Sequence, residues 1–117
     1  MIVIDYQSRT PIYEQIVLEI ERYVALGIYK PKQQIESIRE LATSIGINPN
    51  TVKKAYDELE RRGTITTIST KGTFISDNTE KLLKNKINEK LDMIKKEISE
   101  LEKLGLSKKE ILEKINK

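Results

Sequence analysis

The sequence predicts a mainly α-helical fold with a small β-hairpin: a winged helix-turn-helix over residues 1–76, followed by a C-terminal α-helical segment over residues 77–117. Apolar residues first recur at helical spacing in three successive segments. Two short runs rich in β-branched residues follow, joined by a tight turn that contains glycine. From Asp77 to the end nearly every residue is a good helix former, and charged residues dominate.

The chain opens with a short apolar, strand-like segment, Met1–Ser8, and a polar turn follows it. Thr10–Pro11 then indicates the start of a helix, with threonine as the N-cap and proline in the first helical position. This helix is expected to bury one stripe and to end near Gly27, a suitable C-terminal cap. The stripe consists of Ile12, Ile16, Ile20 and Val24.

Two further helices follow after a loop. Ser37 and Glu40 predict a capping box that opens the first of them, and Gly46 ends it. Asn48–Pro49 starts the next helix by the same cap-and-proline logic, and Gly63 terminates it. Its inward side chains are predicted to be Val52, Ala55, Tyr56 and Leu59. Its outward face then carries Asn50, Lys53, Lys54 and Asp57.

The hairpin is predicted from two β-branched runs, Thr64–Ser69 and Thr73–Ser76, whose tip at Thr70–Gly72 carries a lysine. The tail beyond it begins with a possible capping box of Asp77 with Glu80. A seam of apolar residues then recurs at alternating spacings of four and three, as in about two heptads of a coiled coil. The seam consists of Ile87, Leu91, Ile94, Ile98 and Leu101. Gly105 breaks this helix, and a last short helix begins at the capped segment Ser107–Glu110.

Composition excludes several classes of protein. The 117 residues include no cysteine and no histidine, which rules out disulfides and the usual zinc sites and removes the commonest general acid–base residue. No metal site and no cofactor are therefore expected. The apolar run near the start, Ile2–Ile4, is too short for a signal peptide or a membrane span, so we expect a cytoplasmic protein with no membrane partner.

The net charge of +3 is compatible with nucleic acid but weak evidence by itself. Residues 1–76 hold 10 basic and 9 acidic side chains, so any DNA-facing cations must be focused rather than spread over the surface. A recognition helix, here about residues 48–62, reads the major groove with its N-terminal turns. A wing tip, here about residues 70–73, is suited to phosphate or the minor groove. The candidate DNA-binding residues are Arg39, Asn48, Pro49, Asn50, Thr51, Lys53, Lys54, Lys71 and Gly72.

Some of these residues have a simpler structural interpretation. Asn48 is primarily a helix cap, whether or not DNA is bound. Tyr13 and Tyr56 are expected to pack in the core rather than to stack on bases. Arg61 and Arg62 are expected to lie in a solvated last turn, where they complement the helix dipole. For Lys53 and Lys54, at least one DNA contact is expected because of the asparagine- and threonine-containing turn that precedes them.

Taken together, these motifs resemble the GntR family of bacterial regulators. The resemblance covers about residues 2–76 and rests on Thr10–Ile16, Ser37–Ala42, Asn48–Val52, Ala55–Leu59 and Lys71–Ile75 in that order. The short helical tail, with Leu104–Glu110, resembles that of the YtrA-like subfamily. The resemblance implies a homodimer that binds an imperfect inverted repeat, usually as a repressor, with DNA contacts at the positions of Arg39, residues 48–51, Lys53 and Gly72.

The chain departs from the family pattern before the second helix. Where the family usually has a glycine and then a Leu-Pro-Ser run, this chain has Lys32 and later Ile35–Ser37. The loop should therefore differ, and Glu36 puts an acid near the DNA-facing end. At the wing, Thr70 stands where the family usually has arginine or glycine.

The tail of about forty residues is too short for a full effector domain. Two helices cannot bury their apolar stripes alone, so pairing with a second copy is expected, in preference to packing back on the same chain. Two-fold symmetry would match half-sites about one helical turn, ~34 Å, apart. No residue marks a small-molecule effector site. The alternative function is a winged-helix protein-interaction adaptor without specific DNA readout, and no nucleophile–base pair or phosphate loop suggests an enzyme.

Overall fold

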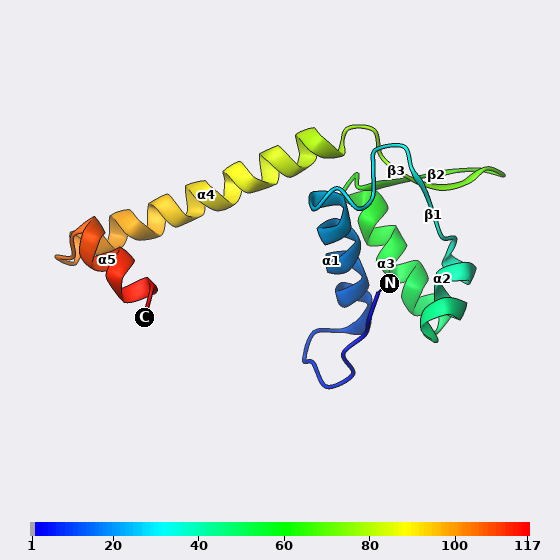
Figure 1. Ribbon diagram of the computed structural model, residues 1–117, viewed down its shortest axis with the longest axis horizontal. Coiled ribbons are helices and arrows are strands. Elements are labelled where there is room, and N and C mark those ends of the chain that lie inside the picture. The colour runs from blue at the N-terminus through cyan, green and yellow to red at the C-terminus, as the bar shows by residue number, and fades with distance from the viewer. Residues whose placement is uncertain (1) are drawn as a thin grey trace. The chain divides into compact units, whose positions relative to one another are not determined.

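The computed structural model describes residues 2–117 and confirms a mainly α-helical fold with a small antiparallel sheet. In chain order the elements are α1 (Ile12–Ala25), β1 (Gln34–Ile35), α2 (Ile38–Ile45), α3 (Pro49–Arg61), β2 (Ile65–Ile68), β3 (Gly72–Ile75), α4 (Thr79–Lys103) and α5 (Lys108–Ile115) (Figure 1). The chain forms two compact units, one extending to Leu82 and one over Leu83–Lys117.

Helix α3 lies at the centre of the first unit and packs against both α1 and α2 (Figure 1). Its inward side chains are those expected from the sequence, and Val52, Ala55 and Leu59 have no exposed surface. On α1 the most buried positions are Ile16, Val17, Ile20 and Tyr23. The helical spacing therefore identified the correct faces, because each helix must turn one apolar stripe toward the others.

The sheet has three strands in the order β1-β3-β2, all antiparallel. The predicted hairpin is present as β2 and β3, with Thr67 opposite Thr73. The third strand was not expected, since β1 lies in the segment that the sequence suggested would be a loop. Its two residues pair with the outer edge of β3, Gln34 opposite Phe74, and this pairing satisfies an edge that would otherwise be open.

The lead-in at the start of the chain is not a strand, which corrects the sequence-based prediction. Its apolar character serves burial instead, since Ile2 is 6% exposed and belongs to the core. The side-chain amide of Gln15 holds the backbone of residues 5–10 in place. Its Nε2 donates to the carbonyls of Asp5 and Thr10, at 3.0 and 2.9 Å. Backbone groups that form hydrogen bonds with a helix side chain do not need a neighbouring strand as a partner.

The helix ends largely follow the predicted caps. The capping box of Ser37 and Glu40 is complete, and Gly46 closes α2 in the left-handed conformation. Gly27, with φ of 74°, follows the end of α1 as expected. The start of α1 differs by one position, because the helix begins at Ile12 and Pro11 occupies the N-cap position without a side-chain cap.

Helix α4 begins in the first unit and runs without interruption into the second, as far as Lys103, and α5 follows after a short turn at Gly105. The predicted capping box of Ser107 and Glu110 is complete. At the other end of α4 the helix begins at Thr79, so the residue before its first turn is Asn78 rather than the predicted Asp77. Among the described residues no helix is both long and apolar enough to cross a membrane.

Candidate nucleic-acid interface

The N-terminal turn of α3 is held in place by Asn48. The side-chain oxygen of Asn48 accepts a hydrogen bond from the backbone N–H of Asn50 at 2.8 Å. Pro49 then occupies the first helical position, where a missing N–H costs nothing. Asn48 is thus used as a cap, as the sequence suggested, and one lone pair of its oxygen is taken up by this bond.

The side chains that follow are directed to solvent. Asn50 and Lys53 are exposed and Thr51 is half-buried. Lys53 Nζ lies 2.8 Å from Asp57 Oδ2, but both side chains are about 60% exposed. An ion pair this open contributes little to stability, so a phosphate can replace Asp57 as the partner of the lysine at small cost. The turn therefore offers an amide, a hydroxyl and a replaceable ammonium group.

Lys54 occupies a different environment from its neighbour. Its Nζ lies 4.0 Å from the centre of the Tyr13 ring on α1, a cation–π contact between two helices. Tyr13 is half-buried and packs against the core, as expected of a packing residue. Lys54 therefore links α3 to α1 in this structure, although it is exposed like Lys53.

Arg39 lies in the first turn of α2 and is exposed. The neighbouring acid, Glu40, is engaged in the capping box, and the backbone N–H and hydroxyl of Ser37 lower the pKa of its carboxyl. Glu40 stays ionised and directed at the helix start, where negative charge is favourable. Arg39 itself forms no ion pair within the described residues.

The wing tip is held by a side chain that the sequence did not single out. The amide nitrogen of Gln34, on β1, donates to the carbonyl of Lys71 at 3.1 Å. The same amide lies over Gly72, where an added Cβ would approach it to 2.5 Å. Gly72 also has a φ of 124°, which other residues rarely adopt. The exposed Lys71 is therefore presented by a hairpin that is fixed at its end.

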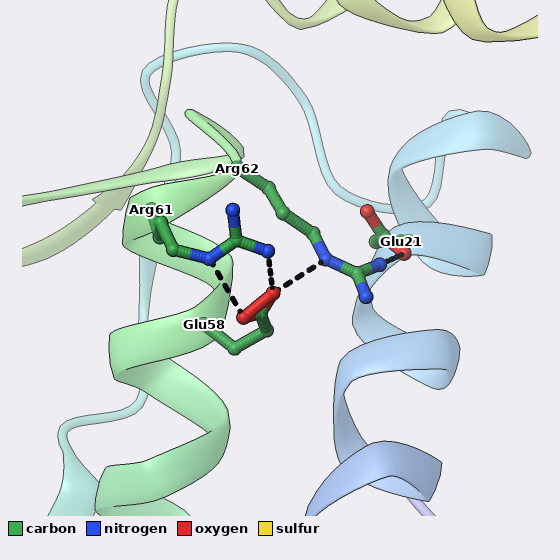
Figure 2. A network of polar contacts seen from close by, with 4 residues as sticks. All are labelled: Glu21, Glu58, Arg61 and Arg62. Carbon is green, nitrogen blue, oxygen red and sulfur yellow. Dashed lines mark hydrogen bonds and ion pairs between the residues drawn. The ribbon is translucent and has the colours of Figure 1, made fainter.

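The far end of α3 carries a network of charges rather than two solvated arginines (Figure 2). Glu58 accepts hydrogen bonds from both Arg61 and Arg62, and these guanidinium groups, Arg61 foremost, lower the pKa of its carboxyl to about 2. Arg62 also reaches α1, where its Nη1 lies 2.8 Å from Glu21 Oε1. The prediction for Arg62 is thus wrong: its side chain is 33% exposed and joins α3 to α1. Arg61, at 72% exposed, fits it.

The predicted seam of the tail lies on the single helix α4. Ile87, Leu91 and Ile94 are each about half exposed, at 49%, 47% and 53%, whereas Ile98 and Leu101 are partly buried. The C-terminal helix contributes Ile111, which is 1% exposed. Seen within its own unit, the tail leaves a continuous apolar stripe open along α4.

No group of three or more acidic residues that could hold a metal ion occurs in the part of the chain that the structure describes. The turn at the start of α3, Arg39 and the wing tip present exposed polar and basic groups, and α4 presents a stripe of half-exposed isoleucine and leucine among its charges. The first set suits a polyanion, and the second suits another apolar helix face.

Comparison with known proteins finds a family match over most of the first unit. Residues 12–75 match the model of the bacterial regulatory proteins of the gntR family. The chain is 48% identical over 101 residues to the HTH-type transcriptional repressor YtrA of Bacillus subtilis (strain 168), covering 86% of this chain and 75% of that protein.

Solved structures agree with the sequence match. A transcriptional regulator from Oenococcus oeni superposes with a TM-score of 0.76 at 38% identity, over 97% of this chain and 94% of the other. The DNA-binding domain of AraR in complex with operator ORX1 superposes with a TM-score of 0.57 at 28% identity, over 62% of this chain and 90% of that domain.

Proposed function

The chain belongs to the gntR family of bacterial regulatory proteins, and from this premise we propose that it is a transcriptional repressor that binds an inverted-repeat operator as a homodimer. It is a DNA-binding transcriptional regulator by family, as its relatives are. The finer statement rests chiefly on one observation, the exposed polar turn at the start of α3. Such a regulator acts in the cytoplasm, where the bacterial chromosome lies.

We assign DNA binding to residues 1–76 and dimerisation to residues 77–117. In this proposal the N-terminal turns of α3 enter the major groove. Asn50 is suited to the donor and acceptor edge of adenine, and Lys53 to guanine or phosphate. Thr51 and the exposed Arg39 are suited to the phosphate backbone, which fixes the position of the helix on the duplex. Asn48 and Pro49 shape the turn that presents these groups.

The wing is assigned to the neighbouring minor groove or its phosphates. Lys71 supplies the charge, and Gly72 provides the backbone conformation and the space for the Gln34 amide that hold the tip in place. Lys54 is given a secondary role, because a lysine that leaves the Tyr13 ring for a phosphate loses a cation–π contact.

Dimerisation is assigned to the seam on α4. A half-exposed stripe of isoleucine and leucine at coiled-coil spacing is best covered by the same stripe of a second copy. A two-fold axis between the copies places two recognition helices symmetrically, which matches an operator with half-sites ~34 Å apart.

Fluorescence anisotropy on DNA from upstream of the protein's own gene tests the proposal. We expect tight binding that survives unrelated competitor DNA and that an Asn50→Ala, Lys53→Ala double variant weakens at least about 30-fold. The control variant, Asn85→Ala with Lys96→Ala, makes the same changes at exposed positions of α4 outside the seam and should bind normally.

If the operator lies elsewhere, the same measurement is made on genomic DNA fragments selected for binding to the protein. Weak binding on all fragments, equal to that on competitor DNA and the same in both variants, would contradict specific readout by α3. The winged helix would then be an adaptor for protein contacts, the alternative considered from the sequence.

A further inference from the structure

A cavity of about 320 Å³ lies in the first unit, between the lead-in, the end of α1 and α2. This is the size of a site for a small molecule. Its apolar lining includes Ile2, Leu41 and Ile45. Ile2 and Leu41 are buried, at 6% and 4% exposed, whereas Ile28 of the same lining is 55% exposed and has apolar surface left to cover. The cavity thus favours a ligand with an apolar body.

Two tyrosines give the cavity aromatic walls. Tyr23 and Tyr29 both line it, and their rings lie at 90° to one another with centroids 5.3 Å apart. Perpendicular rings present π surfaces in two directions. The face of an aromatic ring carries partial negative charge and attracts cations, above all weakly hydrated ones.

Glu36 adds a full negative charge to the same lining. Its Oε2 accepts a hydrogen bond from the hydroxyl of Ser44 at 3.1 Å. Within residues 2–117 no lysine or arginine forms an ion pair with it. Burial and then the charge of Glu36 raise the pKa of the Tyr29 hydroxyl. The cavity is therefore electronegative and has no cation of its own.

From these features we propose that the cavity binds a compact organic cation, an ammonium group with apolar substituents. An anion would be repelled by Glu36. A metal ion would find one carboxylate, that of Glu36, in a lining that is otherwise mainly apolar and aromatic, too few strong oxygen ligands to replace its water. A quaternary ammonium group carries its charge under methyl groups, so it can contact the apolar lining and the tyrosines while the carboxylate neutralises it.

The cavity is joined to the helix-turn-helix. Leu41 and Ser44 belong to α2, and the carbonyl of Glu36 accepts a hydrogen bond from the Tyr56 hydroxyl of α3 at 2.6 Å. A ligand would thus contact the element that carries Arg39. Its importance for regulation rests on the proposed function, but its binding does not, because it can be measured without DNA.

Isothermal titration calorimetry of the full chain with choline tests the proposal. The matched probe is 3,3-dimethyl-1-butanol, which has the shape of choline without the charge. We expect saturable binding of one choline per chain and at least about tenfold weaker binding of the alcohol. Glu36→Gln should weaken choline binding about tenfold, whereas Glu60→Gln, which removes an exposed acid of α3 outside the cavity, should leave it unchanged.

Tyr29→Leu supplies a second variant, which keeps an apolar wall but removes the aromatic ring; it should also weaken choline binding, with the fold checked by circular dichroism. Three results would overturn the proposal: no saturable heat at millimolar choline, equal binding of choline and the alcohol, or equal losses in Glu36→Gln and Glu60→Gln. Each of these can occur in a protein that binds its operator normally, so this test is independent of the proposed function.

Discussion

The two compact units of this chain bury their apolar residues to different extents. In the first unit Ile16, Val17 and Leu59 have no exposed surface at all, and three helices and a sheet close around them. In the second unit Ile111 is buried, but Leu91 and its neighbours along α4 remain about half exposed. The first unit completes its core within one copy of the chain. The second leaves an apolar stripe uncovered, which is why we propose that it associates with a second copy.

The largest effect is expected from negative charge in the seam on α4, because it should prevent two copies from associating. Leu91→Asp with Ile94→Asp places like charges on the stripe that two copies are proposed to share. We expect monomers in sedimentation equilibrium and a loss of operator affinity of more than about 100-fold, because each half-site is then bound alone. The circular dichroism of the winged helix should be unchanged.

Lys96→Asp controls for this experiment, since it changes charge on α4 outside the seam and should leave the dimer intact. A double variant that remains dimeric would show that the copies associate through another surface.

Shortening one leucine in each unit should affect stability in two different ways. Leu59→Ala leaves a cavity in a closed core and should lower the free energy of unfolding by about 2–5 kcal/mol at any protein concentration. Leu91→Ala should lower stability by an amount that depends on protein concentration, because it acts through association. Urea unfolding at two concentrations tenfold apart measures both. A concentration-independent effect at Leu91 would place its partner within the same chain.

A smaller effect is expected at the wing. Gln34→Met keeps the length of the side chain and removes the donor to the Lys71 carbonyl. Operator affinity should fall about three- to tenfold, the worth of one neutral hydrogen bond that positions a contact. Gln33→Met is the matched control, because the side-chain oxygen of Gln33 accepts from the backbone N–H of Lys30 rather than bonding to the wing tip, and the backbone bond of Gln33 to Ile75 is kept. Equal affinities of the two variants would remove the wing from the interface.

The smallest effect concerns pH. The pKa of Glu58 is lowered from 4.5 to about 2, so the ionised form is the one that the folded state favours. Its contribution to stability is present above pH 4.5 and is lost as the pH falls toward 2. The melting temperature of wild type should exceed that of Glu58→Gln by at most a few degrees near neutral pH, and the difference should vanish by about pH 2. A difference that persists there would show that shape, rather than charge, matters.

Local signals in the sequence predicted more of this molecule than distant ones. The caps at Ser37, Asn48 and Ser107 were identified because each involves residues two or three positions apart. The inward faces of the helices followed from their period. The pairing of β1 with β3 was missed, because two residues carry no periodic pattern and their partner lies far along the chain.

The same limit applies to the candidate site. Asn50, Thr51 and Lys53 could be placed on an outward turn from spacing alone. The contact of Lys54 with Tyr13, and those of Arg62 and Gln34, join residues about 40 positions apart that only the folded chain brings together. A signal for Gln34 was present in one respect: the glycine at position 72 implied that something approaches it closely.

The close approach of Gln34 to Gly72 couples the evolution of these two positions. Because a Cβ at residue 72 would lie 2.5 Å from the amide of Gln34, a side chain there would displace that amide from the Lys71 carbonyl, so the two positions do not vary independently. A lineage that shortens residue 34 first gains space at 72, although the backbone there still favours glycine. A lineage that changes Gly72 first loses the wing geometry before any compensation can arise. The order of substitutions, and not only their identity, is therefore constrained at the wing tip.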